Sequence, residues 1–98
     1  MWRHGDVLIA TAKSLPSGAR KRPYLTLAYG EVTGHSHRVK ESDAAELWES
    51  GGVLYLKVVD EKATLIHEEH NPITLPRGLY RVWIQREYTP QQIRQIAD

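Results

Sequence analysis

Short apolar stretches rich in β-branched residues recur along the chain, and residues typical of tight turns separate them. Stretches of this length favour strands over core helices. Strands at such regular spacing are typical of an antiparallel barrel or sandwich. We therefore predict a mostly β protein, a small antiparallel β-barrel or sandwich. Single strands are expected over residues 5–12, 24–32 and 62–70.

Two hairpins are predicted from turn residues that lie between apolar runs. The first covers residues 45–60, where Gly51 and Gly52 supply the positive φ angles of a tight turn. The second covers residues 73–88, where the sequence Leu-Pro-Arg-Gly at 75–78 offers proline at one turn position and glycine two residues later. Both hairpins add antiparallel pairs to the predicted sheet.

A short C-terminal helix is predicted over about residues 90–97. Thr89 can cap it, Pro90 suits the first helical position, and Gln92 completes a capping-box pattern. Because 98 residues fit one small domain, we expect a single domain over residues 1–98 that includes this helix.

The composition excludes several classes of function. The chain has no cysteine, so it has neither a disulfide nor a thiolate, and any metal must be bound by nitrogen and oxygen atoms. Its formal net charge of +1 gives no global argument for nucleic acid. The first twelve residues lack a signal-peptide pattern, and no apolar run reaches transmembrane length. We expect a cytoplasmic protein with no membrane partner.

Four of the five histidines lie in two short stretches, GHSH at 34–37 and HEEH at 67–70. If the first stretch is extended, His35 and His37 point to the same face, where two imidazoles can hold one ion at about 2.0–2.1 Å. His67 and His70 can both join them only if the chain bends between them. His4, isolated in the sequence, is expected at the surface.

Part of this pattern resembles the cupins. His35-Ser36-His37, followed by Glu41, is similar to the first cupin metal motif, and His67, four residues before an asparagine, is similar to the end of the second. The resemblance implies a cupin-like barrel in which His35, His37, Glu41 and His67 are metal ligands. His70 is a further candidate. The expected cofactor is a divalent transition metal, namely Zn, Mn, Fe, Ni or Cu, which could act on a small-molecule substrate.

A second resemblance covers most of the chain. The segments GEVTGHSH, HEEHNPITLPRGLYRV and QREYTP are similar to those of a family of small uncharacterised bacterial and phage proteins. This resemblance implies a microbial, cytoplasmic origin and no assigned activity.

Three alternatives to a metal site stay open. Two histidines on opposing strands can act as general acid and base with a neighbouring arginine such as Arg38, as in a ribonuclease or RNA-binding protein. The candidate binding-surface residues are Arg38, Arg81 and Trp83, and the face that carries Arg81 and Trp83 can bind a partner or form a homodimer, because Trp83 should be partly exposed there. The histidines can also be a solvated loop without chemistry.

Overall fold

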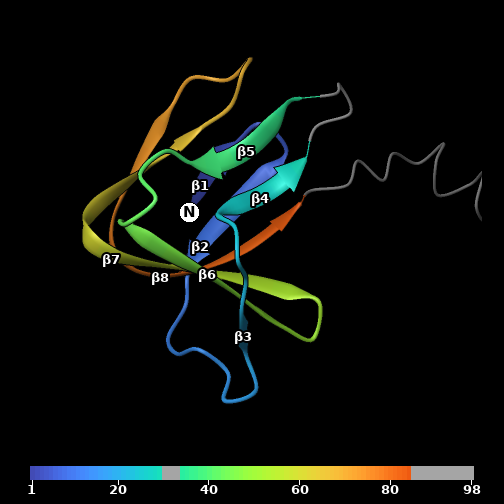
Figure 1. Ribbon diagram of the computed structural model, residues 1–98, viewed down its shortest axis with the longest axis vertical. Helices are drawn as coiled ribbons and strands as arrows, with labels where there is room; N and C mark the ends of the chain where they lie inside the picture. Colours follow the sequence, from blue (N-terminus) through green and yellow to red (C-terminus); the bar gives the residue numbers. More distant parts are fainter. Residues whose placement is uncertain (30–33, 85–98) are drawn as a thin grey trace, which may run out of the picture.

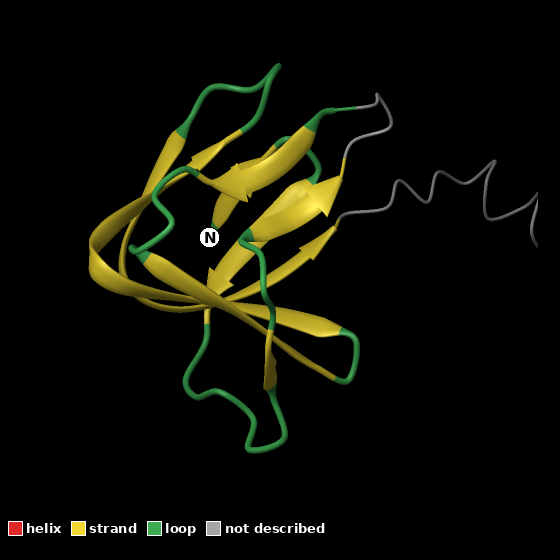
Figure 2. Cartoon of the chain, viewed as in Figure 1, coloured by secondary structure: helices red, strands yellow, loops and turns green. Residues whose placement is uncertain are grey.

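The computed structural model describes residues 1–29 and 34–84, and within them eight strands form one antiparallel sheet (Figures 1 and 2). These ranges contain no helix. The prediction of a mostly β protein is therefore confirmed. The strands are β1 (Trp2–His4), β2 (Val7–Thr11), β3 (Arg20–Lys21), β4 (Thr26–Tyr29), β5 (Ser36–Val39), β6 (Ala45–Ser50), β7 (Val53–Ile66) and β8 (Ile73–Ile84).

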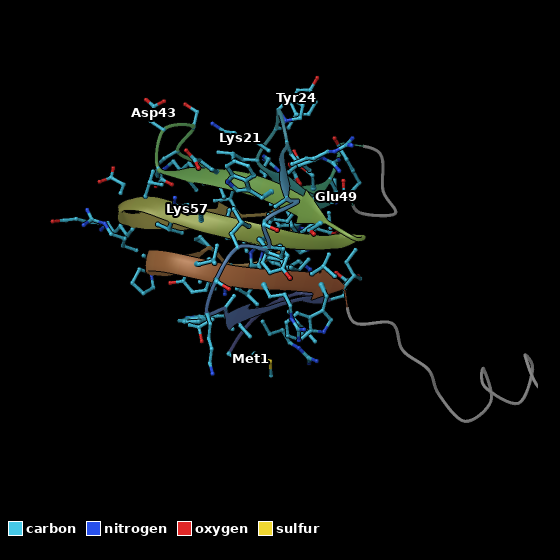
Figure 3. All side chains as sticks on the ribbon, turned by 90° about the horizontal axis from the view of Figure 1, so that it is seen from below. Met1, Lys21, Tyr24, Asp43, Glu49 and Lys57 are labelled. Atoms are coloured by element: carbon cyan, nitrogen blue, oxygen red, sulfur yellow. The ribbon has the colours of Figure 1, made fainter. Side chains whose placement is uncertain are left out.

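The main path of the sheet runs in the order β1-β2-β8-β7-β5-β4, and β6 joins β7 while carrying the short strand β3. Figure 3 shows β6, β7, β8 and β2 side by side. The outer strands of the main path, β1 and β4, do not pair with each other among the described residues. The described strands therefore form an open sheet, and the predicted barrel is not closed.

One edge of strand β7 is shared between two partners, β6 and β5, while β8 pairs along its other edge. Its first half, Val53–Val58, pairs with β6, whereas Leu65 and Ile66 near its end pair with β5. Between these halves, residues 59–61 of β7 lie opposite a single residue of β8, Arg77. Extra residues on one strand of a pair bend that strand and increase its twist. Figure 1 shows β7 and β8 curving together at this point.

The burial pattern of β7 confirms that the bulge changes which side chains face the core. Before it, Leu56 and Val58 are buried, and after it Ala63 and Leu65 are buried. Side chains alternate between the two faces of a regular strand. The buried positions change from even to odd residue numbers across the bulge, and this change requires an interruption of the pleat. The bulge thus keeps one apolar face towards the core along the whole bent strand.

The core is formed by small and branched apolar side chains together with one tyrosine. Its largest fully buried members are Tyr80, Ile9, Leu47, Leu56, Leu65, Leu75, Val7 and Val58. Tyr80 lies edge-on to the ring of Trp2, with 5.3 Å between the ring centroids, and its hydroxyl donates to the carbonyl oxygen of Pro76. The phenol group is therefore satisfied within the apolar core.

The hairpin predicted over residues 45–60 is confirmed, but the one predicted over 73–88 is wrong. Gly51 and Gly52 join β6 to β7 with φ angles of 57° and 81°. By contrast, the Leu-Pro-Arg-Gly segment lies inside the continuous strand β8. These turn residues do mark an irregular part of the chain, because β8 faces the bulge of β7 here. The strand bends at this point but does not reverse its direction. The predicted helix at about 90–97 lies outside the described residues.

Across residues 1–29 and 34–84, we find no helix of the length and apolarity that crossing a bilayer requires.

Candidate metal centre

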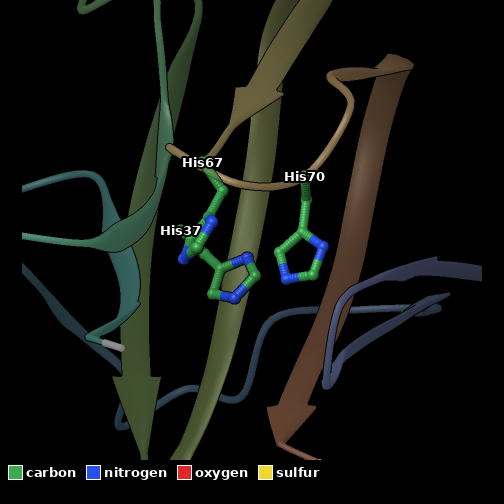
Figure 4. Close-up of side chains that lie close together, drawn as sticks. All are labelled: His37, His67 and His70. Carbon is green, nitrogen blue, oxygen red and sulfur yellow. The ribbon is translucent and has the colours of Figure 1, made fainter. Parts of the chain in front are cut away.

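Three histidines from two distant segments meet at one end of the sheet. His37 lies on β5, and His67 and His70 lie on the connection between β7 and β8 (Figure 4). The ring centroid of His67 is 4.3 Å from that of His37 and 4.7 Å from that of His70, and those of His37 and His70 are 5.6 Å apart. The two histidine stretches that are separate in the sequence therefore converge in space.

The pairing of β5 with β7 explains why these stretches meet. Arg38 pairs with Ile66 in an antiparallel register, so continuing that register by one residue places His37 opposite His67. The chain then bends at residues 68–70, before Asn71-Pro72, and this bend returns His70 to the same site. The prediction that both His67 and His70 require a bend is confirmed.

His35 lies beside His67. Its ring centroid is 5.6 Å from that of His67, and its Nδ1 is 3.4 Å from Oε1 of Glu69. Because His35 and His37 both reach His67, the prediction that they share a face is confirmed. His35 is thus at the edge of the cluster, next to an exposed carboxylate.

His4 is the residue that sequence reasoning missed. The prediction placed it at the surface, but only 2% of it is exposed, and its ring centroid lies 4.9 Å from that of His37. The curvature of the sheet brings β1 towards β5, four steps away along the strand order. The adjacent Gly5 is a residue typical of turns, so the sequence could have indicated that His4 lies at the end of a strand. A side chain at a strand end can contact a neighbouring site. The position of that turn relative to β5 is a tertiary property.

A chain of hydrogen bonds assigns the tautomers of His4 and His37. Nε2 of His4 lies 3.0 Å from the carbonyl oxygen of Asn71, which can only accept, so Nε2 of neutral His4 carries the proton. Nδ1 of His4 is then an acceptor, and the facing Nδ1 of His37, at 2.9 Å, must donate to it. Neutral His37 therefore presents an unprotonated Nε2. A second hydrogen bond that fixes the free nitrogen in this way is typical of metal-binding histidines.

Burial keeps both of these histidines neutral near pH 7. Removal from water first of all, and then the nearby His67 and His4, lower the pKa of His37 to about 4, against an opposing effect of Asp6. The pKa of His4 is also lowered, mainly by burial. Neutral imidazole is the form that binds a metal, so His37 can bind a cation without first releasing a proton.

Two groups of three side chains could each hold a metal ion among the described residues. In the first, one nitrogen from each of His37, His67 and His70 lies within 4.8 Å of the others. In the second, one nitrogen from each of His35 and His67 and one carboxylate oxygen of Glu68 lie within 4.8 Å of one another. The groups share His67, so an ion in one competes with an ion in the other.

The hydrogen bonds of Glu68 favour the first group. Its Oε1 accepts from the backbone N–H of Ser36 at 3.0 Å, and its Oε2 pairs with the guanidinium of Arg38 at 2.8 Å. These contacts, the Ser36 N–H first, lower the pKa of Glu68 to about 2. A metal at Glu68 would have to share these oxygens with the two donors. Glu68 therefore ties the β7–β8 connection to β5 and supports the site from outside.

Gly5 provides the space in which the first group is packed. Its φ angle is 63°, in the region that favours glycine, and a Cβ atom here would lie only 2.7 Å from Nε2 of His70. Any other residue would push His70 away from the cluster. The turn between β1 and β2 is thus shaped around the histidines.

Glu41, which the cupin resemblance implies as a ligand, lies in a different set of contacts. Its two carboxylate oxygens accept hydrogen bonds from the backbone N–H and the hydroxyl of Thr64, at 2.8 and 2.7 Å. These bonds, the hydroxyl first, lower its pKa. Among the described residues, neither three-residue group contains Glu41. Its carboxylate joins the β5–β6 connection to β7.

Replacing Glu41 with alanine should therefore affect stability rather than metal binding. We expect a loss of about 1 kcal/mol, because hydrogen bonds to a charged group are lost at a half-buried position. For a domain of this size, that loss lowers the melting temperature by about 4–8 °C. The measurement is thermal unfolding in EDTA, with Glu61→Ala at the exposed side of the β7 bulge as the matched control. A melting temperature equal to that of the control would contradict this role.

The three residues predicted to form a binding surface do not lie together. Arg38 pairs with Glu68 beside the histidines, whereas Arg81 and Trp83 lie on β8, where Arg81 pairs across the sheet with Tyr55 at the other end of β7. The guanidinium of Arg81 lies 4.8 Å from the ring centroid of Trp83. Trp83 is partly exposed, as predicted. This cation–π pair is separate from the histidine cluster.

The basic run at residues 20–22 is partly neutralised by β6. Lys21 lies 3.7 Å from Glu46, and Arg22 lies 3.2 Å from Glu49. Exposed pairs of this kind contribute little to stability, but they reduce the positive potential that a nucleic-acid backbone would meet.

Comparison with known proteins gives a family but no activity. No curated protein and no solved structure matches the chain. A family described as a domain of unknown function, DUF8820, matches residues 3–85. This match includes all five histidines and seven of the eight strands in full, β1 alone beginning one residue earlier. The chain therefore belongs to the DUF8820 family.

Proposed function

We propose that this protein binds one divalent transition metal ion through His37, His67 and His70. The observation that carries the proposal is the convergence of these three imidazoles within 4.8 Å, together with the unprotonated Nε2 that the hydrogen bonds assign to His37. Three of the other four histidines, His4, His67 and His70, contact His37 through their rings or through a hydrogen bond. A cation bound between these imidazoles would use the nitrogen lone pairs that the packing brings together.

The donor set indicates which ions fit. Imidazole nitrogen suits Zn, Fe, Ni and Cu, and Mn where a carboxylate is also present. Ligands of one tetrahedral ion at normal bond lengths lie about 3.4 Å apart, so the imidazoles must close by about 1 Å on binding. His70 is exposed and can rotate to do so. Nδ1 of His67 now accepts from the backbone N–H of Glu69 at 3.0 Å, and binding through this nitrogen would replace that hydrogen bond.

The proposed ligands differ in part from those implied by the cupin resemblance. His37 and His67 belong to both sets, but His70 takes the place of Glu41, and His35 lies at the edge. Three histidines leave at least one position for water or a small-molecule substrate, where the ion would act as a Lewis acid. We further propose that the protein acts in the cytoplasm, since a chain without cysteine does not depend on an oxidising compartment.

Metal titration of tag-free protein tests the proposal. The protein is stripped with EDTA, dialysed, and titrated with Zn²⁺, Ni²⁺ or Mn²⁺ by calorimetry, and we expect one ion per chain. Free metal at 100 times the dissociation constant should stabilise the fold by about 2.7 kcal/mol, which raises the melting temperature by roughly 10–20 °C. Mg²⁺, which prefers oxygen ligands, is the control ion. Unchanged melting with every transition metal would refute a metal site.

A further inference from the structure

The turn between β1 and β2, residues His4-Gly5-Asp6, forms one wall of the histidine cluster. His4 holds Nδ1 of His37 by a 2.9 Å hydrogen bond, and Gly5 leaves the space that His70 occupies. Asp6 faces the other nitrogen of His37: its Oδ1 lies 3.5 Å from Nε2. Three successive residues thus lie against His37 and His70.

The contact between Asp6 and His37 is electrostatically incomplete. In the assigned tautomer, Nε2 of His37 has a lone pair and no proton, and the facing carboxylate oxygen also carries only lone pairs. Two acceptors at this distance repel each other unless a cation lies between them. Their 3.5 Å separation is close to the roughly 3.4 Å expected for two ligands of one tetrahedral ion.

We propose that Asp6 is the fourth ligand of the metal centre and that His4 is a positioning residue for His37, an inference that rests on the metal site proposed above. Among the described residues, neither group of three whose ligand atoms lie within 4.8 Å contains Asp6, so its exposed side chain must turn towards the ion on binding, and one carboxylate oxygen then binds beside Nε2 of His37. The ligand set becomes three neutral histidines and one carboxylate, which neutralises part of the dication's charge. Such a set favours Zn²⁺, Fe²⁺ or Mn²⁺ over the soft ion Cu⁺.

The exposure of Asp6 matters for how the site works. Its side chain is 64% exposed, whereas that of His37 is 4% exposed, so the carboxylate lies on the solvent side of the ion. A ligand in this position can move aside with little cost to the fold. The structure therefore assigns to Asp6 the coordination position through which water or a substrate would reach the metal.

The variant Asp6→Asn tests this inference, with Asp43→Asn, an exposed aspartate on the β5–β6 connection, as the matched control. We expect Asp6→Asn to bind Zn²⁺ about tenfold more weakly than the wild type, and Asp43→Asn to bind it equally well. Co²⁺ serves as a spectroscopic probe, because its visible absorption is far stronger in a tetrahedral site than in a six-coordinate one. The visible band of the Co²⁺ protein should change in Asp6→Asn and not in the control.

Measurements in EDTA separate a ligand from an ion-pair partner. If Asp6 faces a lone pair, the melting temperature of metal-free Asp6→Asn is equal to or higher than that of the wild type, because an asparagine N–H can donate to Nε2 of His37. A lower melting temperature would mean that Asp6 stabilises a protonated His37, and it would overturn the inference.

The outcomes also distinguish the two proposals. Wild-type protein that binds Zn²⁺, with Asp6→Asn binding it equally and giving the same Co²⁺ spectrum, would overturn the role of Asp6 and leave the three-histidine site intact. Wild-type protein that binds neither Zn²⁺ nor Co²⁺ would overturn the metal site itself.

The positioning role of His4 is tested by two variants. His4→Asn, which can still accept a hydrogen bond from Nδ1 of His37 through its side-chain oxygen, should retain more Zn²⁺ affinity than His4→Leu, which cannot. Equal affinity of these two variants would contradict the positioning role of His4.

Discussion

Replacing His70 with alanine is expected to lower the affinity for Zn²⁺ at least 100-fold, by an order-of-magnitude estimate. Removing a residue that only supports a metal ligand typically costs 10–100-fold, and removing a ligand itself costs more. His70 is the most informative of the three histidines because it is exposed, so the variant should fold normally. Calorimetric titration with Zn²⁺ gives the affinity, and thermal unfolding in EDTA verifies the fold.

The matched control for this experiment is His35→Ala. Both His35 and His70 lie next to His67, but they belong to different groups of three. If the ion binds in the first group, His35→Ala retains Zn²⁺ affinity within a few-fold of the wild type. The reverse result, with loss of binding in His35→Ala and none in His70→Ala, would move the ion to the group that contains Glu68. His37→Ala should also abolish binding, but His37 is buried and its loss also affects stability.

The second large effect concerns stability in acid. In metal-free protein the free energy of unfolding should fall by about 2 kcal/mol between pH 7 and pH 4.5. The pKa of His37 is lowered from 6.5 to about 4 by burial and by its histidine neighbours. Between these values the unfolded chain binds a proton that the folded protein excludes, so stability is present at neutral pH and is lost as the pH falls. The lowered pKa of His4 acts in the same direction.

The chosen pH range isolates the histidines from the carboxyl groups. Glu41 and Glu68 also have lowered pKa values, but their ordinary value is 4.5, so their stabilising effect is lost only below that pH. Urea unfolding in EDTA at pH 7.0, 6.0, 5.0 and 4.5 measures the effect. The variant His37→Gln, which cannot take up a proton in this range, should show a clearly smaller slope. An equal slope in the variant would show that His37 is not the group responsible.

The two predictions are connected through the charge of the cluster. A metal ion and a proton compete for the same lone pairs, so bound Zn²⁺ should protect the fold at pH 6 and lose this effect as the pH approaches 4. The low pKa of His37 makes it a ligand that protons displace only in strong acid. The same burial that makes a charged His37 costly keeps its nitrogen available for a metal.

The sequence predicted the local features of the site correctly. Alternation along an extended chain is enough to place His35 and His37 on one face, and the spacing of His67 and His70 requires a bend if both are to join them. The turn at Gly51 and Gly52 follows equally from local backbone preferences. These inferences succeed because each depends on residues that are neighbours in the chain.

The sequence was less informative where a side chain has a distant partner. Glu41 has the spacing of a cupin ligand, but Thr64 on another strand supplies two hydrogen-bond donors that bind its carboxylate. The Leu-Pro-Arg-Gly segment has the residues of a turn, but the bulge of β7 allows β8 to pass through it as a strand. In each case the structure was decided by a contact with a residue distant in the sequence, and local sequence patterns do not predict such contacts.

The sequence by itself determined that the protein is mostly β, that any metal must be bound by nitrogen and oxygen, and that two histidine pairs are available. Only the tertiary structure decided that these pairs converge in space and that His4 and Asp6 both contact His37. The physical reason is that register and curvature are non-local. The pairing of Arg38 with Ile66 sets His37 opposite His67, and the bend of β7 at residues 59–61 helps to curve the sheet so that β1 reaches β5. A sequence pattern specifies which face a side chain points to, and only the packed sheet specifies what lies across from it.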